Sequence, residues 1–427
     1  MRCYLIYFSL ILFSVSLSGQ IADYKISEYK YQDVKRTFLE ISPDIEINKN
    51  NDFSDRRLRA NAGLWIDFNT RQYSEKIQFT GGAKMSSSFS LIEDDRFSDY
   101  KYRGFIGFLT SSIYYYPKGK WFIGGSTFTR SINFLRISEE ERGRTNLFYT
   151  DTTPWIGYGR IEFVTDMWHA GAILEILETK GLLLKSLNRG DIEEFARIIS
   201  EAKNIRNLDL RLESIDELEL VYNYLVESGI SKNEPLTAFL LKDAYDFEAF
   251  VSRQHGSRIS VYPELQYSSR KRATNSIELQ NDLETTYGFG ITYRNNNAKS
   301  KLIQFNQSYT VKWLNNSINS FDVEEEAVKS FTFSTSHSLG LYVSQRTYFN
   351  AALRISYQEW REEMSVNGPI DNYASISGSW SAFYYMSPRT RFSATYQIGL
   401  VGTNKDEFEN DKGINSDFNL GFQYFIF

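Results

Sequence analysis

The chain has 427 residues, a formal net charge of −5 and a 16% share of aromatic residues. A nucleic-acid partner usually requires a basic face, so this charge argues against one. The mean hydropathy of −0.40 does not exclude a membrane protein, because barrel strands alternate apolar with polar residues.

The first residues predict an export signal. Arg2 precedes an apolar run from Cys3 to Val15, and small residues follow in "SLSGQ". A run of about 13 residues is too short to cross a bilayer as a helix. We therefore expect a signal peptide over residues 1–19. Its removal would take away Cys3, the only cysteine, so the mature chain would have no disulfide.

Residues 20–164 predict the N-terminal half of a β-barrel. In Lys76–Leu91, apolar residues at odd positions alternate with polar residues at even positions. Side chains in a strand point alternately to two faces, so this pattern indicates one lipid-facing and one inward row. Strands are predicted near 36–48, 56–69, 74–91, 98–116, 120–136 and 145–163.

Residues 165–256 predict an inserted α-helical domain, because the apolar residues there recur every three or four positions. Asp191 and Ser214 are expected as helix N-caps, since each is followed three residues later by Glu. Pro235 suits the first turn of a fourth helix, expected to run to about Arg253.

Residues 257–427 predict the C-terminal half of the barrel. The strands there are expected near 257–270, 275–294, 300–315, 327–343, 347–360, 371–386, 390–403 and 415–427. Together they bring the total to about fourteen, an even number as in single-chain bacterial barrels. Short turns alternate with longer polar links, and the helical domain falls where a short turn is due. Because short turns are periplasmic in such barrels, we expect the helical domain and the N-terminus in the periplasm.

The signal peptide, the even strand count and the aromatic C-terminus ending in Phe427 resemble Gram-negative outer-membrane β-barrel proteins over nearly the whole chain. The insert is similar to helical inserts in barrel proteins of the Bacteroidota for which no activity is established. The resemblance implies an outer-membrane location, with outer-membrane lipids and the barrel assembly machinery as partners. One departure is that Phe427 does not share the parity of the apolar row from Phe418 to Ile426.

Charged residues in the inward rows are the candidate functional residues. The lumen-facing candidates are Lys76, Lys84, Glu278, Asp282, Glu284, Lys312, Arg354 and Arg391. A charge that faces hydrocarbon costs about 2–4 kcal/mol at the midplane, so these side chains require a wet or mutually paired lumen. Because the charges are of both signs, two alternatives stay open. Opposite charges across the pore could create a transverse electric field that acts on a polar solute, or they could pair with one another and close the lumen. About fourteen strands leave room for a narrow channel.

These features favour a channel or porin for small polar solutes. The alternative is a barrel that anchors a periplasmic interaction domain for envelope assembly or secretion, with a protein partner for residues 165–256. A second alternative is a lipid-acting enzyme at His337, which shares parity with Phe333 and so would face lipid. Leu339 stands where such enzymes carry a serine, so we expect no enzymatic activity.

The sequence offers little for a metal or a cofactor, and we expect neither. It has three histidines, and His169 and His255 are expected to be surface residues at the two ends of the helical domain. The oligomeric state and the transported solute stay open.

Overall fold

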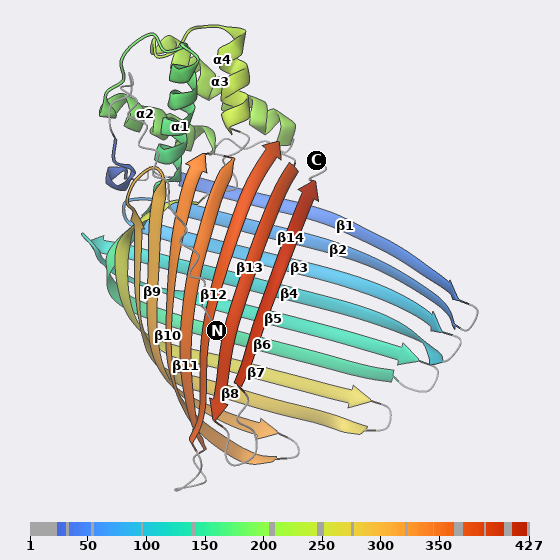
Figure 1. The fold of residues 1–427 in the computed structure, drawn as a ribbon. Helices are drawn as coiled ribbons and strands as arrows, with labels where there is room; N and C mark the ends of the chain where they lie inside the picture. The colour runs from blue at the N-terminus through green and yellow to red at the C-terminus, as the bar shows by residue number, and fades with distance from the viewer. Residues whose placement is uncertain are drawn as a thin grey trace, which may run out of the picture.

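Fourteen antiparallel strands form one sheet in chain order, from β1 to β14, in the computed structural model (Figure 1). The structure describes residues 24–30, 34–52, 55–94, 97–138, 142–204, 210–245, 252–274, 277–320, 323–344, 346–362, 370–387, 390–404 and 412–424. The predicted signal peptide and Phe427 lie outside these ranges. Six strands precede the helical domain: β1 (Val34–Asp52), β2 (Asp55–Tyr73), β3 (Ile77–Asp94), β4 (Phe97–Lys118), β5 (Trp121–Ser138) and β6 (Arg142–Phe163). Eight follow it: β7 (Gln254–Thr274), β8 (Ile277–Ala298), β9 (Ile303–Ser320), β10 (Val323–Ser344), β11 (Thr347–Glu362), β12 (Ile370–Ser387), β13 (Thr390–Asn404) and β14 (Lys412–Tyr424).

The strands are long for a soluble protein. They run from 13 residues in β14 to 22 in β4, whereas soluble strands average about 5–6 residues. A tilted strand needs about 9–11 residues to span a membrane, so even the shortest is sufficient. The predicted fold class, an antiparallel up-and-down barrel sheet with an α-helical insertion, is confirmed.

The two faces of the sheet separate apolar from polar side chains. Outward apolar residues such as Trp121, Phe289 and Phe418 are 58%, 51% and 60% exposed, which is expected where lipid rather than protein covers them. Phe289 stacks on Trp313 of the neighbouring strand, with ring centroids 4.7 Å apart. The sheet curves round on itself (Figure 1), and no ladder joins the described residues of β1 to those of β14.

The insertion between β6 and β7 holds the main hydrophobic core. Its helices are α1 (Thr165–Thr179), α2 (Arg189–Ala202), α3 (Leu210–Glu227) and α4 (Pro235–Tyr245). The helices lie over one end of the sheet (Figure 1), and apolar side chains from all four pack together. The short 3₁₀ helix η1 (Ile26–Glu28) adds Ile26, which is 1% exposed. No helix in the described part of the chain is long and apolar enough to cross a membrane.

The helix starts differ from the sequence prediction at two of three points. Asn188, not Asp191, is the N-cap of α2, and Asp191 forms the other half of that capping box. Ser214 lies inside α3, which begins at Leu210. Pro235 does begin α4, which is described as far as Tyr245, and residues 246–251 of the predicted helix lie outside the described residues.

Candidate functional site: the lumen and its helical cover

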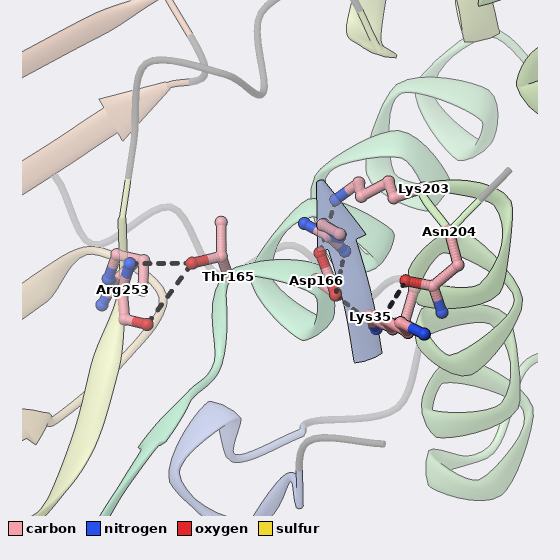
Figure 2. Close-up of polar contacts among 8 residues, drawn as sticks. Lys35, Thr165, Asp166, Lys203, Asn204 and Arg253 are labelled. Atoms are coloured by element: carbon pink, nitrogen blue, oxygen red, sulfur yellow. Dashed lines mark hydrogen bonds and ion pairs between the residues drawn. The ribbon is translucent and has the colours of Figure 1, made fainter. Parts of the chain in front are cut away.

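A narrow neck joins the helical domain to the sheet. The Val164 N–H donates to the Arg253 carbonyl at 2.9 Å. The Arg253 N–H donates to Thr165 Oγ1 at the same distance, as Figure 2 shows. Directly below, Phe163 of β6 pairs with Gln254 of β7. The two ends of the insertion are therefore held side by side.

Arg253 fastens this neck to the turn between β8 and β9. Its Nη1 donates to the Lys301 carbonyl and its Nη2 to the Ser300 carbonyl, each at 2.7 Å. Its guanidinium also lies over the Tyr342 ring, 4.2 Å from the centroid. Burial lowers the pKa of Arg253 to about 10, which leaves the side chain charged at neutral pH. A charged guanidinium group that donates to two backbone carbonyls fixes the position of the turn between β8 and β9.

Two further contacts hold the domain on the ends of the strands. Trp168 Nε1 of α1 donates to the Lys301 carbonyl at 2.9 Å. Arg346, beside β11, pairs with Asp243 of α4 at 2.6 Å. Together with Arg253, they attach α1, α4 and the neck to turns that belong to different hairpins. The helical domain is thus a fixed cover and not a tethered appendage.

A buried charged cluster lies where α1 and α2 meet β1. Asp166 is 1% exposed, pairs with Lys203 and accepts a hydrogen bond from Ser200 (Figure 2). Arg36 of β1 lies 3.7 Å from the same carboxylate. Burial raises the pKa of Asp166, but Lys203 and Arg36 outweigh it, so the pKa is lowered and the carboxylate stays ionised. The Lys35 N–H donates to Asn204 Oδ1 beside this cluster at 3.3 Å.

His169 is fully buried, so the expectation of a surface histidine is wrong. Its Nε2 lies 3.1 Å from the Ala244 carbonyl, and its ring lies 5.5 Å from that of Tyr245. Burial, reinforced by the positive charge of Lys203, lowers the pKa of His169 to about 3. The ring is therefore neutral at physiological pH and serves the packing of α1 against α4.

A polar cavity of about 770 Å³ lies between the sheet and the helical cover. The sheet contributes Arg36, Asn69, Arg71 and Thr110 among others, and the cover side contributes Asp166, Thr165 and Ser252. Side chains of both signs and several hydroxyls thus line the mouth of the lumen. Such a surface suits water and polar solutes better than apolar ones.

Several of the predicted lumen residues take part in polar contacts of the inner wall. Lys84 pairs with Asp67 at 2.6 Å, and Lys312 pairs with buried Glu264 at 2.7 Å. Glu284 accepts a hydrogen bond from Asn316 at 2.9 Å. The pair of Lys84 with Asp67 and the contact of Glu284 with Asn316 join neighbouring strands, and the pair of Lys312 with Glu264 links β9 to β7 across β8.

The other predicted lumen residues are placed as follows. Arg391 lies over the Phe383 ring, 5.4 Å from its centroid, and Arg354 is exposed on β11. Asp282 is half-buried on β8, and the side chain of Glu278 lies outside the described part. Lys76 is a correction: it lies in the turn between β2 and β3, because β3 begins only at Ile77.

His337 has a polar neighbour on the outward face. Its Nε2 lies 2.9 Å from Thr335 Oγ1, and its ring meets the edge of Tyr309 with centroids 5.3 Å apart. Among the residues that the structure describes, no group of three or more His, Cys, Asp or Glu could hold a metal ion.

No family model matches the chain, and no curated protein is similar to it in sequence. Solved structures do match. A loop-deletion mutant of OmpT, an outer-membrane protein of Vibrio cholerae, is 8% identical over 92% of this chain and 99% of its own, with a TM-score of 0.28. The β domain of the Bordetella autotransporter BrkA is 6% identical over 92% and 99%, with a TM-score of 0.26. CymD, a monoaromatic hydrocarbon channel, is 9% identical over 94% and 90%, with a TM-score of 0.25.

The matched structures are outer-membrane β-barrels, and the similarity concerns the fold alone. They do not bear on the resemblance to barrels of the Bacteroidota. The prediction that the chain is not an enzyme is corrected. The matched barrels, OmpT among them, do not share one role. The barrel fold therefore gives no ground for excluding an activity.

Proposed function

We propose that the chain is an outer-membrane channel for small polar solutes, with the helical domain at its periplasmic mouth. The observation that carries the proposal is the polar cavity of about 770 Å³ under the helical cover. Ion pairs along the inner wall, such as Lys84 with Asp67, continue the polar surface into the lumen. An exposed apolar row on the other face is what a lipid-facing wall requires.

The position of the helical domain supports its periplasmic assignment. It occupies the end of the sheet at which β4–β5 and β8–β9 are linked by short turns, whereas the two longest links between described strands, from β11 to β12 and from β13 to β14, lie at the opposite end. In outer-membrane barrels the short turns are periplasmic and the longer loops are extracellular. Protease protection of the domain in intact cells, followed by cleavage after the outer membrane is permeabilised, tests this placement.

Conductance tests the channel. The purified full-length protein, inserted into a planar bilayer, is expected to carry steady ionic current. Thr110→Trp, which fills part of the cavity, is expected to lower the unitary conductance. Thr127→Trp on the outward row of β5 is the matched control and is expected to leave it unchanged. A folded protein that never conducts would overturn the proposal.

A second candidate function, a docking surface for an envelope protein, is favoured by one observation. Phe239 and Leu236 of α4 are 72% and 47% exposed on the helical domain. Single exposed apolar residues are ordinary, but two in one turn of a short helix form an apolar contact surface for a partner. A photo-crosslinker at position 239 of the full chain in cells tests this, with the exposed position 194 on α2 as control. Equal labelling at both positions would remove the candidate.

A further inference from the structure

A second, smaller cavity lies in the inner wall and is lined by strand residues. It measures about 170 Å³ and is lined by side chains of β4 to β9. Three of the lining residues are basic, namely Arg258, Arg294 and Lys312, and Glu264 is the acidic one. Lys312 already neutralises Glu264 through contacts of 2.7 and 2.8 Å to its two carboxylate oxygens. The two guanidinium groups therefore supply the net charge of the cavity.

The two arginines face each other without an acid between them. Arg258 of β7 and Arg294 of β8 are directly opposite in the antiparallel ladder. Like charges at such positions destabilise a sheet, since the Cβ atoms are only about 4.5–5.5 Å apart. No ion pair between described residues involves either side chain. An anion held between them would remove the repulsion.

Stacked aromatic rings hold Arg258 in place. Its guanidinium lies 3.7 Å from the centroid of the Tyr114 ring, and Tyr114 in turn stacks on Trp155 at 4.7 Å. Gly124 lies across from Trp155, and a Cβ there would come within 2.6 Å of Trp155 Nε1. The absence of a side chain at Gly124 thus makes room for the indole. A guanidinium stacked on an aromatic face keeps its N–H groups in a defined plane, ready for an acceptor.

Two donors in this wall lack an acceptor. Arg258 Nη1 and Trp155 Nε1 are both buried and have no hydrogen-bond partner among the described residues. A buried donor without a partner costs about 1–3 kcal/mol, so such groups in a native wall call for a ligand or water. The hydroxyls of Ser260 and Thr292 line the same cavity. Every one of these groups can donate to an oxygen.

We propose that this cavity binds small oxyanions, carboxylates or inorganic phosphate, as they pass through the lumen. The inference rests on the proposed channel function and names its solute class. Two guanidinium groups on adjacent strands match the paired oxygens of a carboxylate or phosphate, which they bind with parallel charge-assisted hydrogen bonds. The volume of about 170 Å³ admits a small anion and not a folded chain.

The test uses succinate and inorganic phosphate as separate probes on the full-length protein in planar bilayers. In a KCl gradient the reversal potential is expected to show anion preference, and each probe is expected to reduce the chloride current. In the doubly substituted R258Q/R294Q protein, the blocking concentration is expected to rise about tenfold or more, because charge-assisted hydrogen bonds are lost. Block by one probe alone would assign the site to carboxylates or to phosphate.

Two control variants distinguish a specific anion-binding site from the general electrostatic potential of the lumen. Arg354→Gln removes one positive charge from β11, on another part of the inner wall, and is expected to leave the block unchanged. Arg258→Lys keeps the charge but loses the planar fork, and is expected to weaken the block while the anion preference remains. Equal weakening by Arg354→Gln, or no weakening by R258Q/R294Q, would overturn the proposal.

A binding measurement in detergent, which does not depend on ionic current, tests the oxyanion site separately from the channel function. Titration of either probe into the folded protein in detergent is expected to change tryptophan fluorescence, and Trp155→Phe is expected to remove most of that change. If the protein conducts but neither probe binds or blocks, the oxyanion site is refuted and the channel stands. If it binds a probe but never conducts, the channel is refuted and the site stands.

Discussion

Asp166→Asn removes the ionised partner of Lys203 while preserving the shape of the side chain. Lys203 is 8% exposed and the Asp166 carboxylate is its ion-pair partner, so the substitution removes the nearest counter-charge of a buried ammonium group and leaves the weaker attraction of Glu217. Loss of one partner of a buried ion pair costs about 3–5 kcal/mol. We expect the packing of α1 against α2 to weaken by that order.

Hydrogen exchange of the folded full-length protein measures this effect locally, since the barrel strands need not unfold. The amides of α1 and α2 are expected to exchange about a hundredfold faster or more in Asp166→Asn. Adding Lys203→Met removes the buried ammonium group and is expected to restore a large part of the protection of the α1 and α2 amides against exchange. Glu175→Gln breaks a more exposed pair with Lys301 and is the control, with a change of less than about 1 kcal/mol.

Two results would refute this reasoning. The first is an unchanged exchange rate in Asp166→Asn, which would mean that the Lys203 charge is solvated in the native protein. The second is a double variant that is as unstable as the sum of the two single variants. That result would mean that the two side chains act independently.

Further predictions concern single positions. The pKa of His169 is about 3 in the folded domain and about 6.5 in an open chain, so the open state binds more protons between these values and stability falls as pH drops. Hydrogen exchange of α1 should therefore show a loss of about 2 kcal/mol from pH 7 to pH 5, and His169→Gln should abolish that slope. Arg253→Lys should loosen the neck by about 2 kcal/mol, seen as faster exchange at the β8–β9 turn, because the lysine cannot reach the Ser300 and Lys301 carbonyls together. Gly159→Ala should lower the thermal midpoint of the barrel, since φ is +106° there and the new Cβ would lie 2.2 Å from the Ser257 carbonyl oxygen. Asp243→Ala should change the thermal midpoint little, because its pair with Arg346 is exposed.

The repeating features of this protein could be predicted from its sequence. Alternation of period 2 located the strands, because a strand between lipid and a wet interior must alternate. The helical insertion could be predicted because the spacing of its apolar residues changes from every second position to every three or four positions, and changes back after it. Pro235 marked the start of α4 since proline is tolerated in the first helical turn.

The partners of individual side chains could not be predicted. Asp166 looks like an ordinary acid in the first turn of a helix, and only the packing of α2 and β1 shows that Lys203 and Arg36 surround it. Asn188 and Asp191 form the capping box of α2, whereas the spacing rule predicts Asp191 with Glu194, one box length too late in the chain. Lys76 continues the alternation of β3 by sequence, but the turn ends just after it, and periodicity alone does not show where pairing begins.

The neck has a consequence for how the barrel is assembled. Pairing β6 with β7 requires closure of a loop of roughly ninety residues, which costs about 3 kcal/mol more than closure of a four-residue turn. If the four helices fold first, Val164 and Arg253 are already joined by a hydrogen bond of 2.9 Å. The conformational entropy of the long loop is then lost before β6 and β7 pair. The insertion can thus act as a folded hairpin turn, which lets the two halves of the barrel register as neighbours.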